Sequence, residues 1–177
     1  SRVDEHLRPV PGTEKEYKCD TLILSVGLIP ENELSLDAGV TLDDRTKGAV
    51  VDEHFQTDVA GIFAAGNVLH VSMEAESLAD SAAEFVQKGC LPPCPIEIGT
   101  DSHINHTVPQ RVSGTRDFKL SLRVNSPLKE CRIEVRQDGV LVASKKMKKA
   151  IPAEMIELTV KADKLVSMGR LEVSAEC

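Results

Sequence analysis

The sequence predicts an α/β portion followed by a small antiparallel β domain. Up to about residue 90, near-continuous apolar runs alternate with a helix-like segment, which is typical of strands buried on both faces of a sheet. From about residue 106 onward, apolar residues recur at every second position, which is typical of half-buried antiparallel strands. We therefore expect residues 1–89 to be α/β, residues 90–105 to be a linker and residues 106–177 to be a small sandwich-like β domain.

The α/β portion contains three expected strands joined by turns. The run TLILSV ends the first strand, Tyr17–Val26, and its continuous apolar character indicates burial on both faces. A turn follows, because Pro30 fixes its own φ angle and polar residues come directly after it. GAVVDEHFQT (48–57) predicts a short strand with polar ends. GIFAAG (61–66) predicts another buried strand, since the run is too short for a helix and ends in glycine.

One amphipathic helix is predicted over Ala75–Lys88. Its apolar residues share one face and its charged residues share the other. The apolar positions are Leu78, Ala82, Phe85 and Val86, and the charged positions are Glu76, Asp80, Glu84 and Lys88. Gly89 suits the position just after the helix, where a left-handed backbone ends it.

The remaining elements are a proline-rich segment and a series of short strands. CLPPCPIEIG (90–99) has three prolines in its first six residues, so its composition predicts a linker. FKLSLRV (118–124) alternates apolar and polar residues, as a half-buried strand does. The pair Asp138-Gly139 lies between two alternating runs and predicts a tight hairpin. MIELTV (155–160) and RLEVSAE (170–176) supply two further strands.

Composition argues against several classes of function. The chain has 177 residues, a formal net charge of -7, no Trp and 3% aromatic residues, which argues against nucleic-acid binding. No apolar run is long enough to cross a membrane, and no membrane partner is expected. The five cysteines are scattered, which argues against a disulfide framework and favours the cytoplasm. Because the sequence begins at Ser1 rather than Met, we expect a piece of a longer protein.

The stretch TDVAGIFAAGN (57–67) carries the main candidate site. A buried parallel strand places its carboxyl end at the edge where open α/β sheets bind ligands. Gly66 leaves no side chain in the way of a ligand, and the amide of Asn67 can both donate to and accept from hydroxyl groups. The helix expected from Ala75 adds free N–H groups and a partial positive charge. This combination suits a polyhydroxyl chain beside a group that becomes anionic.

The order of these residues resembles a known family. CDTLILSVGLIPENEL (19–34), the pair Gly39-Val40 and GAVVDEHFQTDVAGIFAAGNV (48–68) together resemble the C-terminal half of the pyridine nucleotide–disulfide oxidoreductases. These are flavoproteins with one FAD domain and one NAD(P) domain. The resemblance covers about residues 19–89 and implies that this portion is part of a Rossmann-like FAD/NAD(P)-binding fold. It also implies FAD and NAD(P) as cofactors.

The resemblance further implies roles for particular residues. It places Gly66, Asn67 and Val68 beside the ribityl chain of FAD. The helix that begins at Ala75 would stabilise reduced flavin, and Gly27 would let NAD(P) approach or simply form a turn. The family usually has Asp where this chain has Asn67, so a hydrogen bond there lacks charge assistance. The family's glycine-rich pyrophosphate loops lie upstream of such a segment, so this chain alone is expected to be inactive.

Several other residues have both a functional and a structural interpretation. Cys90 and Cys94 form C-x3-C-x8-H-x2-H with His103 and His106, and these ligand types suit zinc although their spacing departs from that of zinc fingers. The two cysteines could also be a redox pair or plain linker thiols. His70 could act as an acid or base at the flavin edge, or be an ordinary structural or surface residue.

The sequence leaves two hypotheses of function. The first is an FAD-dependent oxidoreductase that passes a hydride between NAD(P)(H), flavin and a small-molecule substrate, with the group that acts on that substrate unknown. The second is that residues 106–177 are a non-catalytic module that binds a partner subunit or forms a homodimer. The basic run KKMKK (145–149) is interpreted as a solvated strand edge guarded by lysine, with a phosphate or partner site as the alternative.

Overall fold

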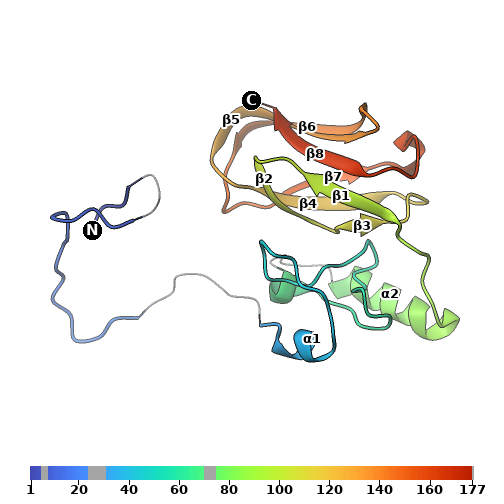
Figure 1. The fold of residues 1–177 in the computed structure, drawn as a ribbon, viewed down its shortest axis with the longest axis horizontal. Coiled ribbons are helices and arrows are strands. Elements are labelled where there is room, and N and C mark those ends of the chain that lie inside the picture. Colours follow the sequence, from blue (N-terminus) through green and yellow to red (C-terminus); the bar gives the residue numbers. More distant parts are fainter. Residues whose placement is uncertain (5–7, 24–30, 70–74, 177) are drawn as a thin grey trace.

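The structure, a computed structural model, describes residues 1–4, 8–23, 31–69 and 75–176 (Figure 1). Its elements in chain order are α1 (Glu33–Asp37), the 3-10 helix η1 (Gly66–Leu69), α2 (Ala75–Lys88), β1 (Ile96–Thr100), β2 (Ile104–Val108), β3 (Arg111–Val112), β4 (Phe118–Val124), β5 (Leu128–Gln137), β6 (Val140–Ala150), β7 (Ile156–Val160), the 3-10 helix η2 (Ala162–Lys164) and β8 (Leu171–Glu176). Among the described residues, both α-helices precede the strands, and all named strands lie after α2.

The strands form a two-layer sandwich with one hydrophobic core. One sheet has five strands in the order β3-β1-β8-β5-β6, and the other has three in the order β2-β4-β7. All named strand pairs are antiparallel except β1 and β8, which run parallel. The inward residues of both sheets meet in one cluster, as expected from their period-two pattern. Its fully buried aliphatic members include Ile104, Leu120, Leu122, Ile133, Val135 and Leu171.

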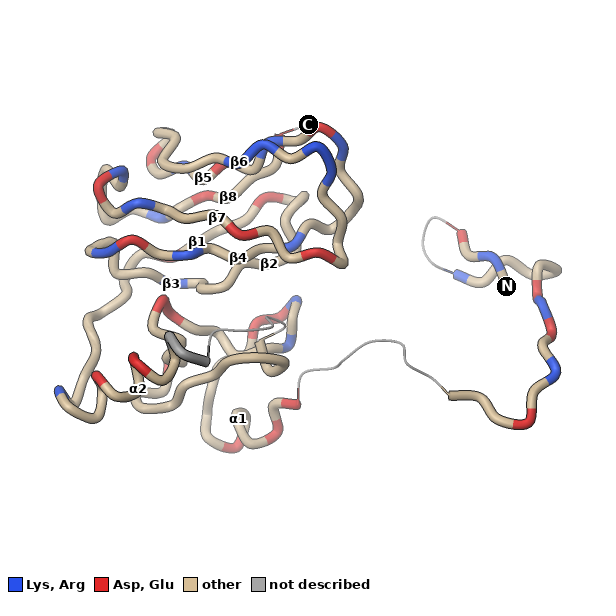
Figure 2. The backbone as a smooth tube through the Cα atoms, turned by 180° about the vertical axis from the view of Figure 1, so that it is seen from behind, with Lys and Arg blue, Asp and Glu red and all other residues tan. Residues whose placement is uncertain are grey.

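The predicted hairpin at Asp138-Gly139 is confirmed. Gln137 of β5 faces Val140 of β6, so the turn contains only Asp138 and Gly139. Both have positive φ angles, 49° and 81°, which matches the right-handed twist of the flanking strands. The lysines of β6 lie on the outermost strand of the five-stranded sheet, where charge discourages pairing with another chain (Figure 2).

The predicted strands of the α/β portion do not form among the described residues. Residues 17–23 have no regular structure, and Leu22 and Ile23 are 74% and 86% exposed. The segment 48–66 contains only isolated bridges: Leu42 with Ala49, Val51 with Thr57, Asp52 with Arg111 and Gln56 with Phe63. A strand buried on both faces needs a paired neighbouring strand on each side for its backbone, and among the described residues no continuous ladder pairs with either segment. Helix α2, by contrast, has the predicted bounds.

The segment predicted as a linker, residues 90–105, contains the first strand of the sandwich. Strand β1 occupies Ile96–Thr100 and pairs with β3 and β8, so only the proline-rich start of this segment connects the two portions. Ile96 and Ile98 alternate with polar Glu97, and this period-two pattern outweighs the nearby prolines. Strand β2 likewise begins at Ile104, inside the expected linker.

The α/β portion and the sandwich are joined by direct contacts. The backbone N–H of Gln110 donates to Val51 O at 3.0 Å, and its side-chain Oε1 accepts from Val51 N at 2.9 Å. Arg45 Nη1 donates to the carbonyl oxygens of Ile104 and Asn105, both at 2.9 Å. A second apolar cluster, in which Val108 is the sandwich residue, lies under the α/β segment. It contains Val40, Ala49, Val51, Ala64, Leu69 and Val108.

Two further observations concern the placement of the N-terminal residues and the length of the helices. Residues 1–4 and 8–23 extend away from the rest of the molecule (Figure 1). Among the helices that the structure describes, none is long and apolar enough to span a bilayer.

Candidate functional site

The stretch that the sequence singles out ends in a short 3-10 helix rather than at the edge of a sheet. Gly66 begins η1 with a φ angle of 73°, a left-handed conformation that favours glycine. Apart from its chain neighbours, none of the described residues has an atom within 4 Å of where its Cβ would be. Asn67 follows with its side chain exposed. The amide of Asn67 and the bare backbone of Gly66 are thus both accessible.

Two residues from the preceding loop hold this helix in place. The buried side chain of Asn32 donates to Lys47 O at 3.0 Å and to Val68 O at 3.2 Å. Gly48 packs directly beneath, since a Cβ there would lie 2.6 Å from Val68 O and 3.0 Å from the Cα of Leu69. The turn at Gly66–Leu69 is therefore fixed by one buried amide and one close backbone contact.

The other predicted cofactor residues are only partly placed. Ala75 is the first residue of α2, so it lies at the end of the helix that carries the partial positive charge. Residues 70–74 separate α2 from η1 and lie outside the described residues, as does His70. Gly27 also lies outside them. The structure thus describes the end of η1 and the start of α2 but not the residues between them.

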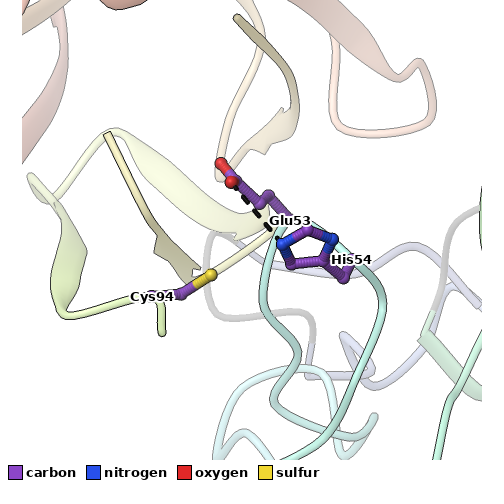
Figure 3. A group of neighbouring side chains, drawn as sticks. All are labelled: Glu53, His54 and Cys94. Carbon is purple, nitrogen blue, oxygen red and sulfur yellow. Dashed lines mark ion pairs between the residues drawn. The ribbon is translucent and has the colours of Figure 1, made fainter. Parts of the chain in front are cut away.

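A second group of side chains lies where the α/β portion meets the sandwich. Glu53 and His54 come from the loop between Val51 and Thr57, and Cys94 comes from the proline-rich connection (Figure 3). One ligand-type atom from each of the three lies within 4.8 Å of the others. Glu53 and His54 are buried, with His54 only 1% exposed, and Cys94 is half-buried. We call Glu53, His54 and Cys94 the junction cluster.

The hydrogen bonds of the junction cluster are unevenly distributed. Ser113 Oγ donates to Glu53 Oε1 at 2.6 Å, and Arg116 Nε lies 3.4 Å from the same oxygen. Among the described residues, Glu53 Oε2 has no hydrogen-bond partner, and neither ring nitrogen of His54 has one. His54 Nε2 lies 3.8 Å from Glu53 Oε1, too far for a hydrogen bond. The two buried side chains therefore keep ligand atoms available.

The electrostatics of the junction cluster act on Cys94. Burial, followed by the negative charges of Asp52 and Glu53, raises the pKa of Cys94 to about 12. The side chain is therefore a neutral thiol near neutral pH, and its Sγ lies 3.7 Å from Pro92 O. Because the thiolate is the reactive form, Cys94 is a poor nucleophile in this state.

The C-x3-C-x8-H-x2-H zinc set is not assembled among the described residues. Cys94 meets Glu53 and His54 instead of Cys90, His103 and His106. His103 is exposed in the turn before β2, while His106 is buried in β2, where its Nδ1 lies 2.9 Å from Asn105 Oδ1. His106 thus lies in strand β2 of the sandwich and His103 in the turn before it. Both Cys90 and Cys94 are free thiols, not a disulfide.

Sequence reasoning did not identify the junction cluster. Its members are forty residues apart, and DEH (52–54) was interpreted only as the polar end of a strand. In the sequence, His54 only follows two carboxylates in a short polar run, Asp52–His54, which is usually solvated. Only the fold shows that Cys94 lies beside it.

The α/β portion matches known proteins. The sequence model of the family described as "Pyridine nucleotide-disulphide oxidoreductase" matches residues 2–85. Dihydrolipoyl dehydrogenase of Manduca sexta is 37% identical over 78 residues, which cover 43% of this chain and 16% of that protein. Mitochondrial dihydrolipoyl dehydrogenase of Caenorhabditis elegans is 38% identical over 77 residues, again 43% of this chain and 16% of that protein. No solved structure matches. The aligned part of the chain thus spans 16% of the length of these relatives.

Proposed function

The N-terminal half of this chain belongs to the pyridine nucleotide-disulphide oxidoreductase family, and on that premise we propose that the chain is part of an FAD-dependent oxidoreductase. The complete protein passes a hydride between NAD(P)(H), flavin and a small-molecule substrate. The observation that supports this proposal is the turn Gly66–Leu69 inside the matched region, in which Gly66 has a left-handed backbone and the amide of Asn67 is exposed.

In this proposal the turn binds the ribityl chain of FAD. Gly66 lets the cofactor approach the backbone, and the amide of Asn67 exchanges hydrogen bonds with ribityl hydroxyls. Val68 takes part through its backbone, whose carbonyl is already held by Asn32. This anchoring supports the proposal, because a binding turn must keep its shape when the cofactor leaves.

The helix α2 and Gly27 have separate roles in the proposal. The N-terminus of α2 at Ala75 faces the flavin and stabilises the negative charge of its reduced form. Gly27 gives NAD(P) room to approach. When bound, the flavin supplies the hydride acceptor and donor, while these residues bind and orient it.

We also propose that this chain alone does not catalyse the reaction. The exposed apolar side chains Leu22 and Ile23 support this, since they suit a buried strand that packs against a further part of the α/β unit. The turn at Gly66 contacts only one part of a dinucleotide. The four cysteines described as free thiols are in keeping with a reducing compartment, and we propose the cytoplasm.

The experiment that tests the proposal is FAD retention by the complete protein that carries this chain. Flavin absorbance and fluorescence are measured for the wild type, for Asn67→Ala and for the control Gln87→Ala. The control removes an exposed side-chain amide from α2, whereas Asn67 lies in η1. We expect the wild type and the control to retain FAD, and Asn67→Ala to bind it about tenfold more weakly, the loss of one neutral hydrogen bond. A complete protein without flavin would contradict the proposal.

A second candidate function is assembly through the β domain. Four exposed apolar side chains gather around the β5–β6 hairpin, because the loop after η2 is hydrogen-bonded to Gln137 at the end of β5. They are Val140, Leu141, Val166 and Met168. We propose that this apolar surface contacts a partner subunit. Gel filtration over a range of concentrations, with and without FAD, tests it: a concentration-dependent complex that Met168→Asp abolishes supports assembly, and a monomer at every concentration shows that the chain does not pair with itself.

A further inference from the structure

The junction cluster has the composition of a transition-metal site. Glutamate, histidine and cysteine provide one oxygen, one nitrogen and one sulfur ligand, a mixture that suits Zn²⁺. Mg²⁺ and Ca²⁺ prefer oxygen ligands alone, so they fit this set poorly. Three protein ligands leave a fourth position for water, which is a known arrangement for zinc. We propose that Glu53, His54 and Cys94 bind one zinc ion, which links the α/β portion to the β sandwich.

The distances in the cluster are close to those that a metal requires. Zinc bonds of about 2.0–2.3 Å at tetrahedral angles place ligand atoms roughly 3.3–3.7 Å apart. The ligand atoms of Glu53, His54 and Cys94 lie within 4.8 Å of one another, and Figure 3 shows the three side chains gathered around one point. A closure of about 1 Å is therefore needed, which small rotations about the side-chain bonds supply.

The free atoms are those that a metal would use. Ser113 and Arg116 contact Glu53 Oε1, while Oε2 has no hydrogen-bond partner among the described residues, so the carboxylate keeps bonding capacity for a metal. These two contacts also orient the carboxylate, as partners behind a metal ligand usually do. Both nitrogens of His54 are buried without a hydrogen-bond partner among the described residues. A buried polar atom left in this state is destabilising, and a metal bond to one nitrogen removes that cost for it.

The charges around the cluster favour a divalent cation. The two adjacent carboxylates Asp52 and Glu53 outnumber the single positive charge of Arg116, whose Nε lies 3.4 Å from Glu53 Oε1, and this balance attracts a positive ion. On binding, the thiol of Cys94 transfers its proton to solvent, and the sulfur lone pair forms the bond to the metal. The ion, the Glu53 carboxylate and the Cys94 thiolate together then carry no net charge, which a buried site requires.

The local backbone holds the ligands in place. Asp52 Oδ1 accepts hydrogen bonds from the backbone N–H of His54 at 2.9 Å and of Gln56 at 3.1 Å, which closes a tight turn around the histidine. Phe55 at its centre has a φ angle of 61°, a left-handed conformation that a bulky residue rarely adopts. Cys94 lies between Pro93 and Pro95, so its backbone has little freedom.

The test is metal binding by the full 177-residue chain, with cobalt as the spectroscopic probe. The metal-free chain is titrated with Co²⁺, and the near-ultraviolet charge-transfer band of a cobalt–thiolate bond is recorded. Competition with Zn²⁺ then gives the zinc affinity. We expect one ion per chain, a charge-transfer band, and displacement of cobalt by zinc, since zinc binds such sites more tightly than cobalt does.

Matched variants separate the proposed ligands from neighbouring side chains of the same type. Cys94→Ser abolishes the charge-transfer band and His54→Gln weakens binding more than about 100-fold, while Ser113→Ala, which only orients Glu53, weakens it about 10–100-fold. The controls Cys90→Ser and His103→Gln leave the band and the affinity unchanged. Circular dichroism of each variant without metal checks that it folds.

Two results would overturn the proposal. The first is a wild-type chain that shows no cobalt–thiolate band and binds no zinc at micromolar concentration. The second is binding that survives Cys94→Ser in a folded chain or is lost equally in Cys90→Ser, because the metal would then sit elsewhere.

Discussion

Replacing Gly48 with alanine should disturb the turn that we assign to the cofactor. A Cβ at this position would lie 2.6 Å from Val68 O and 3.0 Å from the Cα of Leu69, and both atoms belong to the backbone. An ordinary contact between a methyl carbon and these atoms is longer by several tenths of an ångström, so η1 must move. Overpacking of this kind costs about 1–3 kcal/mol. For a chain of this size, about 2 kcal/mol corresponds to a fall in Tm of roughly 4–8 °C.

Gly99→Ala is the matched control, because its clash has a different character. The nearest atoms to a Cβ at Gly99 are those of the Arg170 guanidinium, and they come even closer than Val68 O comes to Gly48. Arg170 is a long, exposed side chain that can swing away, so we expect a change within about 0.5 kcal/mol. Thermal unfolding followed by circular dichroism compares both variants with the wild type. A Gly48→Ala variant as stable as Gly99→Ala would refute the close contact and the fixed turn.

Three further predictions concern other parts of the chain. Burial raises the pKa of Cys94 to about 12, so this thiol should react with iodoacetamide at pH 8 roughly a hundred- to a thousandfold more slowly than an ordinary thiol. Mass spectrometry measures the rate, with the exposed Cys90 as internal reference. Equal rates at the two cysteines would refute the burial of Cys94. The hydrogen bond from Lys161 lowers the pKa of Asp117, so we expect the wild type to be more stable than Asp117→Asn above the ordinary carboxyl pKa. This difference in stability should disappear as the pH falls through the lowered pKa. Urea unfolding at several pH values measures it, and a difference independent of pH would contradict the prediction. Leu120→Ala should cost about 2–5 kcal/mol in urea unfolding, because Leu120 is fully buried between the sheets, and a loss below about 1 kcal/mol would contradict that burial.

The sequence predicts those elements whose signal lies within the element itself. Helix α2 has an apolar face and a glycine at its end, and both are local properties. The hairpin at Asp138-Gly139 is likewise set by the two residues that accept a left-handed backbone. Strand Phe118–Val124 follows from its alternation. In each case the residues that form the element also contain the reason for it.

The strands predicted for the α/β portion fail for the opposite reason. TLILSV and GIFAAG indicate burial on both faces, but a parallel strand is stable only when strands from other parts of the sequence pair with it. Among the described residues, the segment around Phe63 has only a single bridge, to Gln56, and its backbone bonds are made in turns. The apolar character of these residues therefore predicted strands covered on both faces of a sheet. The described residues do not form such a sheet around them.

The junction cluster shows why a site can escape prediction from the sequence although each of its residues is visible there. Spacing rules assume that ligands close together in the sequence share a site, which led from Cys94 to Cys90, His103 and His106. The fold instead turns β2 into the sandwich and brings Cys94 against a loop forty residues earlier. What makes Glu53 and His54 notable is their burial without sufficient hydrogen bonds, and burial at a junction between two portions is a property of tertiary structure alone. A charged or polar residue in a short polar run is usually solvated, so nothing local distinguishes His54 from a surface histidine until the packing around it is known.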